Sequence, residues 1–109
     1  MTRQAAGFVR GHYYAEYVDV VRSLRREGRE TEAQTLLLEL VEATEAESRA
    51  RNWVVAPWYY EQLAISYRKC GDIDDEVAIL GRYTRQIHDL SNPLLARLEK
   101  ARAHAARAD

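Results

Sequence analysis

An internal repeat is the feature of this 109-residue sequence that most limits what it can fold into. The stretch 17–28 reads Tyr-x2-Val-Val-x2-Leu-Arg-Arg-x-Gly, and 43 residues later the stretch 60–71 reads Tyr-x2-Leu-Ala-x2-Tyr-Arg-Lys-x-Gly. Each copy leads into a second apolar segment, opened by Glu32-Ala33 and by Glu76-Val77. Repeats of this kind are typical of stacked helical arrays. We therefore predict two units of helix, glycine turn and helix, an architecture that usually binds other molecules.

The composition agrees with an all-α protein. Apolar residues make up 47% of the sequence and charged residues 30%, while glycine (5) and proline (2) are scarce. This balance is typical of a mostly helical globular protein, and no alternating strand pattern is visible. The length fits one domain over residues 1–109.

The sequence also bears on location. The first ten residues lack the apolar run of a signal peptide, and no stretch reaches the roughly 18 apolar residues that a membrane span needs. Cys70 is the only cysteine, which fits a reducing compartment. We expect a cytoplasmic protein. The preference for arginine over lysine, with abundant alanine, is typical of a high-GC bacterial or phage genome.

Apolar residues at intervals of three and four predict five helices over about 12–27, 30–51, 57–70, 72–90 and 92–107. The predicted buried positions are, helix by helix, Tyr14, Tyr17, Val20, Val21 and Leu24; Ala33, Leu36, Leu37, Leu40, Val41 and Thr44; Tyr60, Leu63, Ala64 and Tyr67; Val77, Leu80, Thr84, Ile87 and Leu90; Leu94, Leu95, Leu98, Ala101 and Ala105.

Helix boundaries are marked by a few residues. Gly28 and Gly71 tolerate the left-handed backbone that closes a helix. Asp72 or Asp74 can cap the fourth helix. Pro57 fits the first turn of the third helix, as Pro93 does in the fifth after the capping sequence Ser91-Asn92. We further expect Trp53 to anchor the connector before Pro57, and the polar face of the last helix (Arg97, Glu99, Lys100, Arg102) to meet water.

Charge is segregated along the first half of the sequence, although the net charge is only -1. Residues 3–29 carry six arginines and three acids, which gives +3, whereas residues 30–47 carry six glutamates and no basic residue, which gives -6. The first helical pair therefore sets a basic helix beside an acidic one. Beyond Thr44 the apolar stripe fades, so we expect residues 42–51 to stand partly clear of the core.

These residues resemble the tetratricopeptide repeat (TPR) family. In that family an aromatic residue starts the first helix, a leucine and a small residue follow, a tyrosine comes one turn later, and then Gly-Asp and Glu-Ala. The second copy matches in order with one extra residue before Glu76; the first copy matches less well, and the repeat length is 43 rather than 34. The resemblance implies two repeats, about 12–51 and 57–90, with a capping helix at about 92–107, in a short α-solenoid.

The resemblance also implies a peptide-binding groove lined by the first helix of each repeat. The matching groove positions are Arg22, Arg25, Arg26, Trp58, Glu61, Ile65, Arg68 and Lys69. Arginine binds carboxylates with a two-pronged geometry, so an acidic segment or the carboxyl terminus of a partner protein is the expected ligand. Two alternatives stay open. The arginines can pair only with the acidic second helix, and Trp58 can pack beneath another helix.

The sequence offers little for catalysis. His12, His88 and His104 fall on different predicted segments without ligand spacing, so we expect no metal site. No glycine-rich phosphate loop, nucleophile elbow or paired-carboxylate motif is recognisable. We predict neither an enzyme nor a cofactor.

Three functions follow from these features. The leading one is a protein-interaction module or adaptor that binds a peptide or partner protein. The second is a self-assembling structural protein, based on the basic and acidic helices and the protruding residues 42–51. The third is a regulator that contacts nucleic acid through its arginine-rich helix, which the net charge disfavours.

Overall fold

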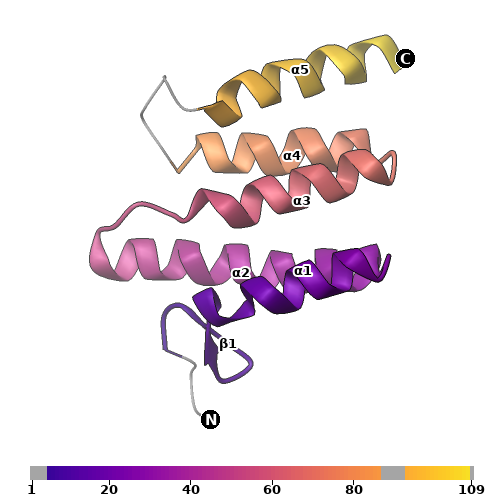
Figure 1. The fold of residues 1–109 in the computed structure, drawn as a ribbon. Coiled ribbons are helices and arrows are strands. Elements are labelled where there is room, and N and C mark those ends of the chain that lie inside the picture. The colour runs from indigo at the N-terminus through magenta and orange to yellow at the C-terminus, as the bar shows by residue number, and fades with distance from the viewer. Residues whose placement is uncertain (1–4, 87–92, 109) are drawn as a thin grey trace. The chain divides into compact units, whose positions relative to one another are not determined.

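The computed structural model describes residues 5–86 and 93–108, which are all-α apart from one small β-hairpin (Figure 1). The described helices are α1 (Val18–Arg26), α2 (Glu30–Arg51), α3 (Pro57–Lys69), α4 (Ile73–Thr84) and α5 (Pro93–Ala108). The protein divides into two compact units, Met1–Ala56 and Pro57–Asp109. The division falls between the two predicted repeats.

The first unit begins with a hairpin that the sequence did not suggest. Strands β1 (Phe8–Val9) and β2 (His12–Tyr13) pair antiparallel, and a 3-10 turn, η1 (Tyr14–Tyr17), leads into α1. The predictions of a helix from His12 and of no strand were therefore wrong. Arg10 (φ 50°) and Gly11 (φ 87°) both adopt the left-handed backbone that a two-residue hairpin turn requires.

Helix α2 provides most of the core of the first unit. Its observed bounds, Glu30–Arg51, match the prediction. All six predicted stripe residues are buried: Ala33, Leu36, Leu37, Leu40, Val41 and Thr44. Helix α1 packs against α2 but is fully buried only at Val21, whereas Val20 is 46% exposed and was wrongly assigned to the core. Tyr14, Tyr17 and Leu24, which were predicted to be buried, are half-buried.

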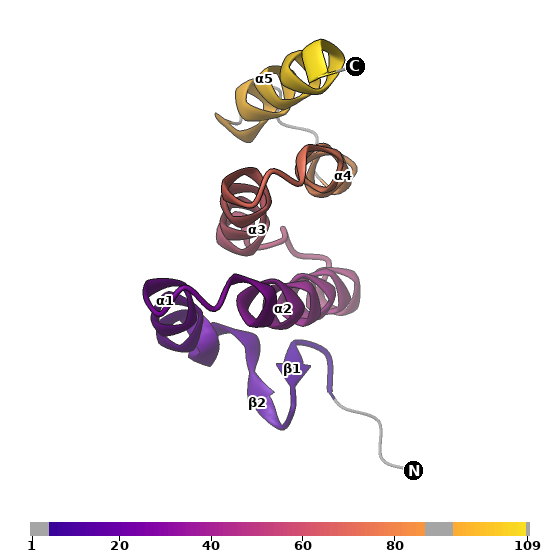
Figure 2. The ribbon, with the colours of Figure 1, turned by 90° about the vertical axis from the view of Figure 1, so that its right-hand side faces the viewer.

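Residues 42–51 of α2 stand only partly clear of the core, as expected: Glu42 and residues 49–51 are exposed, while much of the segment between them is buried. Strand β1 packs against α2, and Figure 2 shows the hairpin lying beside it. Val9, Ala43 and Glu47 are buried there. The glutamates made this segment look solvated, because sequence periodicity gave no sign of the hairpin that covers it.

The second unit is built on α3 and α4. The four predicted core residues of α3 are buried (Tyr60, Leu63, Ala64 and Tyr67). In α4 the prediction is confirmed at Leu80, whereas Val77 and Thr84 are only half-buried. The buried residues of α4 are Glu76, Ile79, Leu80 and Tyr83. The predicted core positions Ile87 and Leu90 lie outside the described residues.

Helix α5 packs against α4, which in turn packs against α3. In Figure 2, which looks nearly along α3 and α4, α5 lies above α4 in the same unit. Helix α5 begins at Pro93, as predicted, and buries Leu98 and Ala101, while Ala105 is half-buried. The predicted capping pair Ser91-Asn92 lies outside the described residues, as do the side chains of Leu94 and Leu95.

The two glycine turns have the same hydrogen-bond pattern. The N–H of Gly28 donates to the Arg25 carbonyl (3.1 Å), and the N–H of Arg29 donates to the Leu24 carbonyl (2.9 Å). Forty-three residues on, Gly71 donates to Arg68 (3.1 Å) and Asp72 to Tyr67 (2.8 Å). Both glycines have positive φ, +75° and +78°. The predicted role of the glycines in ending each first helix is confirmed.

The equivalence continues into the second helix of each unit. The N–H of Ala33 donates to the Arg29 carbonyl at 3.0 Å, and the N–H of Glu76 donates to the Asp72 carbonyl at the same distance. Glu76 is therefore the structural counterpart of Ala33, and aligning it with Glu32 was wrong by one residue. Asp72 occupies the capping position of α4 without a side-chain hydrogen bond to the helix, so the expected cap does not form.

Candidate functional site

The predicted site residues of the first unit, on α1, have ionic or polar partners close by. Arg25 lies 3.5 Å from Glu30 through its Nε atom, and both side chains are largely buried. Arg22 lies 4.0 Å from Asp19, and the Nη2 of Arg26 donates to the Ser23 hydroxyl at 3.1 Å. Exposed pairs such as that of Arg22 contribute little stability, about 0–1 kcal/mol. The α1 arginines therefore belong to a local charge network.

Further pairs neutralise the charge segregation inside the first unit. Arg29 pairs with Glu32 and with Glu27, and Arg10 of the hairpin turn pairs with Glu39. The hydrogen bonds from Arg29 lower the pKa of the Glu32 carboxyl, because they favour its charged form. Basic and acidic segments thus meet within the first unit itself.

The predicted site residues of the second unit all lie on α3. Trp58, Glu61 and Ile65 are half-buried, whereas Arg68 and Lys69 are exposed. The Trp58 ring meets Tyr59 edge-on with centroids 5.1 Å apart. Trp58 is therefore neither fully exposed, as an open groove residue would be, nor fully packed beneath another helix.

A basic hollow opens between α3 and α5 in the second unit. It has a volume of about 590 Å³ and is lined by Arg68 of α3 and by Arg97, Glu99, Lys100 and Ala103 of α5. The described lining thus carries three cations and one carboxylate. Arg97 is also 3.9 Å from Glu61, so a second predicted residue joins the rim of the basic hollow.

Sequence reasoning missed the α5 side of the basic hollow. Lys100 is exposed, as expected of a water-facing residue, and Arg97 is half-buried, yet each directly precedes a buried residue, Leu98 or Ala101. A helix residue beside a buried stripe lies at the edge of the packed face. That position in the stripe was the available signal, although the hollow itself depends on how α5 packs.

Arg68 has a buried partner behind the basic hollow. Its Nη1 atom lies 3.8 Å from Oε2 of Glu76, a separation too long for a hydrogen bond. Glu76 is only 1% exposed, and neither of its carboxylate oxygens accepts a hydrogen bond within the described part of the protein. Buried carboxylates normally have such partners, so the environment of Glu76 is unusual.

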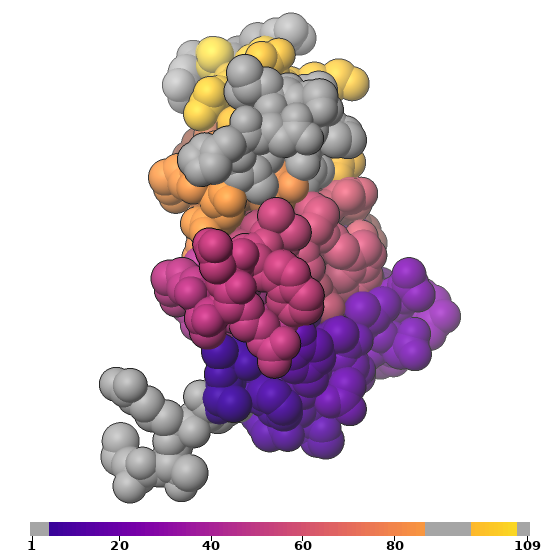
Figure 3. All heavy atoms as spheres, turned by 90° about the vertical axis from the view of Figure 1, so that its left-hand side faces the viewer, coloured from indigo at the N-terminus to yellow at the C-terminus, as the bar shows by residue number. Residues whose placement is uncertain are grey.

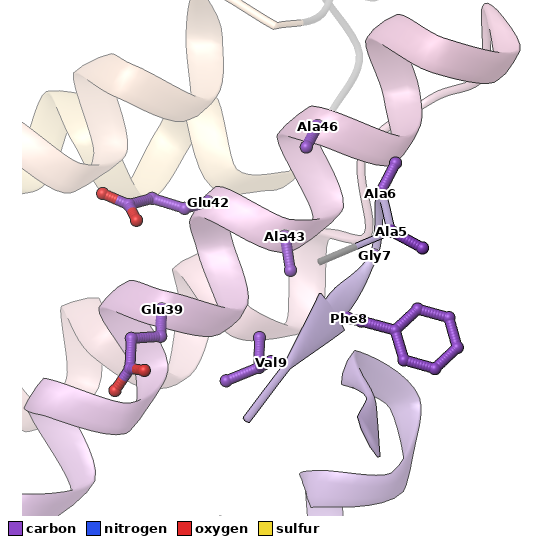
Figure 4. A pocket seen from close by; sticks show the side chains of 9 residues that line it. All are labelled: Ala5, Ala6, Gly7, Phe8, Val9, Glu39, Glu42, Ala43 and Ala46. Carbon is purple, nitrogen blue, oxygen red and sulfur yellow. The ribbon is translucent and has the colours of Figure 1, made fainter. Parts of the chain in front are cut away.

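The first unit has two hollows of its own. One, of about 240 Å³, lies between the hairpin and α2 (Figure 4). Its lining is mostly small side chains, with Val9 directed to α2 and the Phe8 ring turned away. The other, of about 360 Å³, is lined by Val20, Leu24 and Leu36 with polar residues at its edge. The first of these hollows has two acids in its described lining, Glu39 and Glu42, and no cation, so of the three hollows only the basic hollow has more than one cation in its described lining.

A second buried carboxylate lies under the hairpin. The Tyr13 hydroxyl donates to Oε1 of Glu47 at 2.5 Å, while Oε2 accepts no hydrogen bond from the described residues. Burial, together with the hydrogen bond to Glu47, raises the pKa of the Tyr13 hydroxyl. This contact fastens the hairpin to α2 and gives no access to a ligand.

The connector after α2 carries the most exposed apolar side chains described. Figure 3 looks at the face where this segment lies. Trp53 is 58% exposed and Val54 is 81% exposed, with Arg51 5.6 Å from the centre of the Trp53 ring. Trp53 is anchored by its backbone, since its N–H donates to the Ser48 carbonyl at 3.0 Å. Trp53 thus holds the turn, as expected, but through its backbone and not through its exposed side chain.

Metal-binding and membrane-spanning features are missing from the described residues. Within residues 5–86 and 93–108, no three His, Cys, Asp or Glu side chains are grouped so that they could hold a metal ion. In the same residues, no helix has the length and apolar character that would let it span a membrane. No protein-family model, curated protein or solved structure matches this sequence.

Proposed function

We propose that the protein is a binding module that takes an acidic segment of a partner protein in the basic hollow. One observation carries this proposal: Arg68 from α3 and Arg97 and Lys100 from α5 line the same hollow, with Glu99 as the only acid in its described lining. Arginine binds carboxylates through paired hydrogen bonds, and lysine adds a point charge. The ligand class is therefore a peptide rich in aspartate or glutamate.

The duplicated turns support the TPR-like description that this proposal uses. Two helical hairpins end their first helices at Gly28 and Gly71 with the same hydrogen bonds. Helix α5, packed on α4, then corresponds to the capping helix of a short solenoid. We also keep the cytoplasm as the compartment, because Cys70, the only cysteine of the sequence, is exposed.

A titration with a simple acidic probe tests the proposal. Hexaglutamate should shift backbone NMR signals around Arg68 and Lys100 at low salt, and hexaglutamine should not. The double variant Arg68→Gln/Lys100→Gln should weaken binding at least about tenfold, because two of the cations are removed. Arg102→Gln is the matched control, since Arg102 is an exposed α5 residue outside the lining. Equal shifts with both peptides would reject the proposal.

Self-assembly has one observation in its favour, which is the exposed pair Trp53 and Val54. A tryptophan next to arginine is a common centre of protein–protein interfaces. Charge segregation gives self-assembly little support, because the basic and acidic segments pair with each other within the first unit. The segment 42–51 also offers less free surface than expected, because Ala43, Glu45 and Glu47 are buried. Sedimentation velocity over a range of concentrations distinguishes this function from peptide binding.

Binding of nucleic acid has less support. It was based on the arginine-rich first helix, but Arg25 pairs with Glu30 and the neighbouring Arg29 pairs with two glutamates. Phosphates would have to compete with these carboxylates. Retardation of DNA or RNA at low salt is the measurement that would restore this function.

A further inference from the structure

The two units differ at one equivalent buried position. Ala33 and Glu76 make the same backbone hydrogen bond to the residue that precedes the second helix of their unit. Ala33 is 0% exposed and Glu76 is 1% exposed. A small apolar residue therefore suffices here in the first unit, whereas the second unit buries a carboxylate.

A buried carboxylate is unfavourable unless it is compensated. Loss of hydration costs several kcal/mol, as an order of magnitude, and hydrogen bonds or a close cation must offset it. Glu76 receives no hydrogen bond from the described residues, and its ion-pair partner there is Arg68, at 3.8 Å. The side chain of Arg68 remains 47% exposed and lines the basic hollow. One guanidinium thus serves both the buried acid and the hollow.

We propose that Glu76 sets the affinity of the basic hollow by competing with the ligand for Arg68. This inference rests on the proposed function, because the ligand is the acidic segment assigned above. A ligand carboxylate that draws Arg68 toward itself leaves Glu76 buried without its cation. That loss opposes binding, so Glu76 keeps the interaction weaker than the three cations alone would make it.

The direction of the effect separates this role from a structural one. Glu76→Gln preserves the size of the side chain and removes its charge, which frees Arg68 for the ligand. We expect hexaglutamate to bind about threefold to tenfold more tightly to this variant. A residue that only supports the fold would weaken binding or leave it unchanged when replaced.

Glu99→Gln is the matched control for simple electrostatics. Glu99 also lines the basic hollow, so its neutralisation strengthens binding of an acidic probe without involving Arg68. In an Arg68→Gln background the Glu99→Gln gain should persist, whereas the Glu76→Gln gain should vanish. Glu76→Ala provides a second variant, because alanine already occupies the equivalent position in the first unit.

The experiment is a set of NMR titrations with hexaglutamate on the folded variants, each checked by circular dichroism. Tighter binding by Glu76→Gln that depends on Arg68 supports the inference. If the wild type binds hexaglutamate and neither Glu76→Gln nor Glu76→Ala binds it more tightly, the inference is overturned and the proposed function stands. If the wild type fails to bind but Glu76→Gln binds, the inference stands and the proposed function fails for the native protein. If neither binds, both are overturned.

Discussion

The hydroxyl of Tyr13 donates a hydrogen bond to the carboxylate of Glu47, and this contact joins residues 34 positions apart in the sequence. Because Glu47 is 2% exposed, its carboxylate depends on protein donors. The hairpin is therefore held to α2 by a polar contact as well as by the burial of Val9.

Replacing Tyr13 by phenylalanine should destabilise the protein. The Glu47 carboxylate would keep its burial and lose its donor, at a cost of about 1–3 kcal/mol. Urea unfolding followed by circular dichroism measures the change. Tyr67→Phe is the control, because the Tyr67 ring is buried, whereas that of Tyr13 is half-buried, and the Tyr67 hydroxyl has no hydrogen-bond partner among the described residues. Equal losses in both variants would contradict a specific role for the Tyr13 bond.

Stability should fall in alkaline solution. Burial raises the pKa of Tyr13 and of Tyr67, so the unfolded protein, with tyrosine pKa values near about 10, loses these protons first. The stabilisation is fully present below pH about 10 and is lost as the pH rises toward the folded pKa values. Unfolding at a series of pH values checks the sign. In Tyr13→Phe the alkaline loss should be smaller.

Gly7→Ala should be more harmful than Gly28→Ala. Both glycines have positive φ, so either substitution strains the backbone by about 1 kcal/mol. At Gly7 an added Cβ would also overlap the Glu47 carboxylate and lie 2.9 Å from the Tyr13 ring, whereas at Gly28 the space is open. Thermal unfolding of the two variants gives the comparison. A larger loss for Gly28→Ala would mean that the hairpin does not sit closely on Glu47.

Arg25→Gln should destabilise the first unit by about 1 kcal/mol, because Arg25 and Glu30 pair where solvent is largely excluded. Arg22→Gln on the same helix should change stability by less than about 0.5 kcal/mol, since its pair with Asp19 is exposed. Denaturant midpoints of the two variants test this ordering. Similar effects would indicate that burial does not distinguish the pairs.

Trp53→Ser should leave the stability of the monomer within about 0.5 kcal/mol, because the side chain is mostly exposed and its backbone bond to Ser48 remains. If the protein self-associates through the connector, the same variant should dissociate. Sedimentation velocity and urea unfolding together separate the two effects. Unchanged association would remove the connector from consideration as an interface.

Residue periodicity predicted the α2 bounds and most of the core correctly, because long amphipathic segments carry many consistent positions. It misassigned 12–17, since Tyr14 and Tyr17 are spaced by three and fit a 3-10 turn as well as an α-helix. Glu76 was aligned with Glu32 instead of Ala33, because the two copies were matched by residue type and not by the number of residues after the glycine. Both errors concern short segments governed by backbone geometry.

The candidate site was predicted in part. Arg68 was named through the resemblance to the TPR family, whereas Arg97 and Lys100 line the same hollow only because α5 packs on α4. The proximity of residues on different helices depends on tertiary packing, and the periodicity of a single helix does not predict it. The burial of Glu76 is likewise invisible in the sequence, where a glutamate in the first turn of a helix looks solvated.

The matched turns at Gly28 and Gly71 give the protein an internal reference. A substitution made in one turn can be repeated 43 residues away against the same backbone hydrogen bonds, so the difference between the two results isolates the surrounding side chains. Ala33→Glu would place in the first unit the acid that the second unit already tolerates. The protein thus allows the energetics of a buried charge to be measured twice within a single molecule.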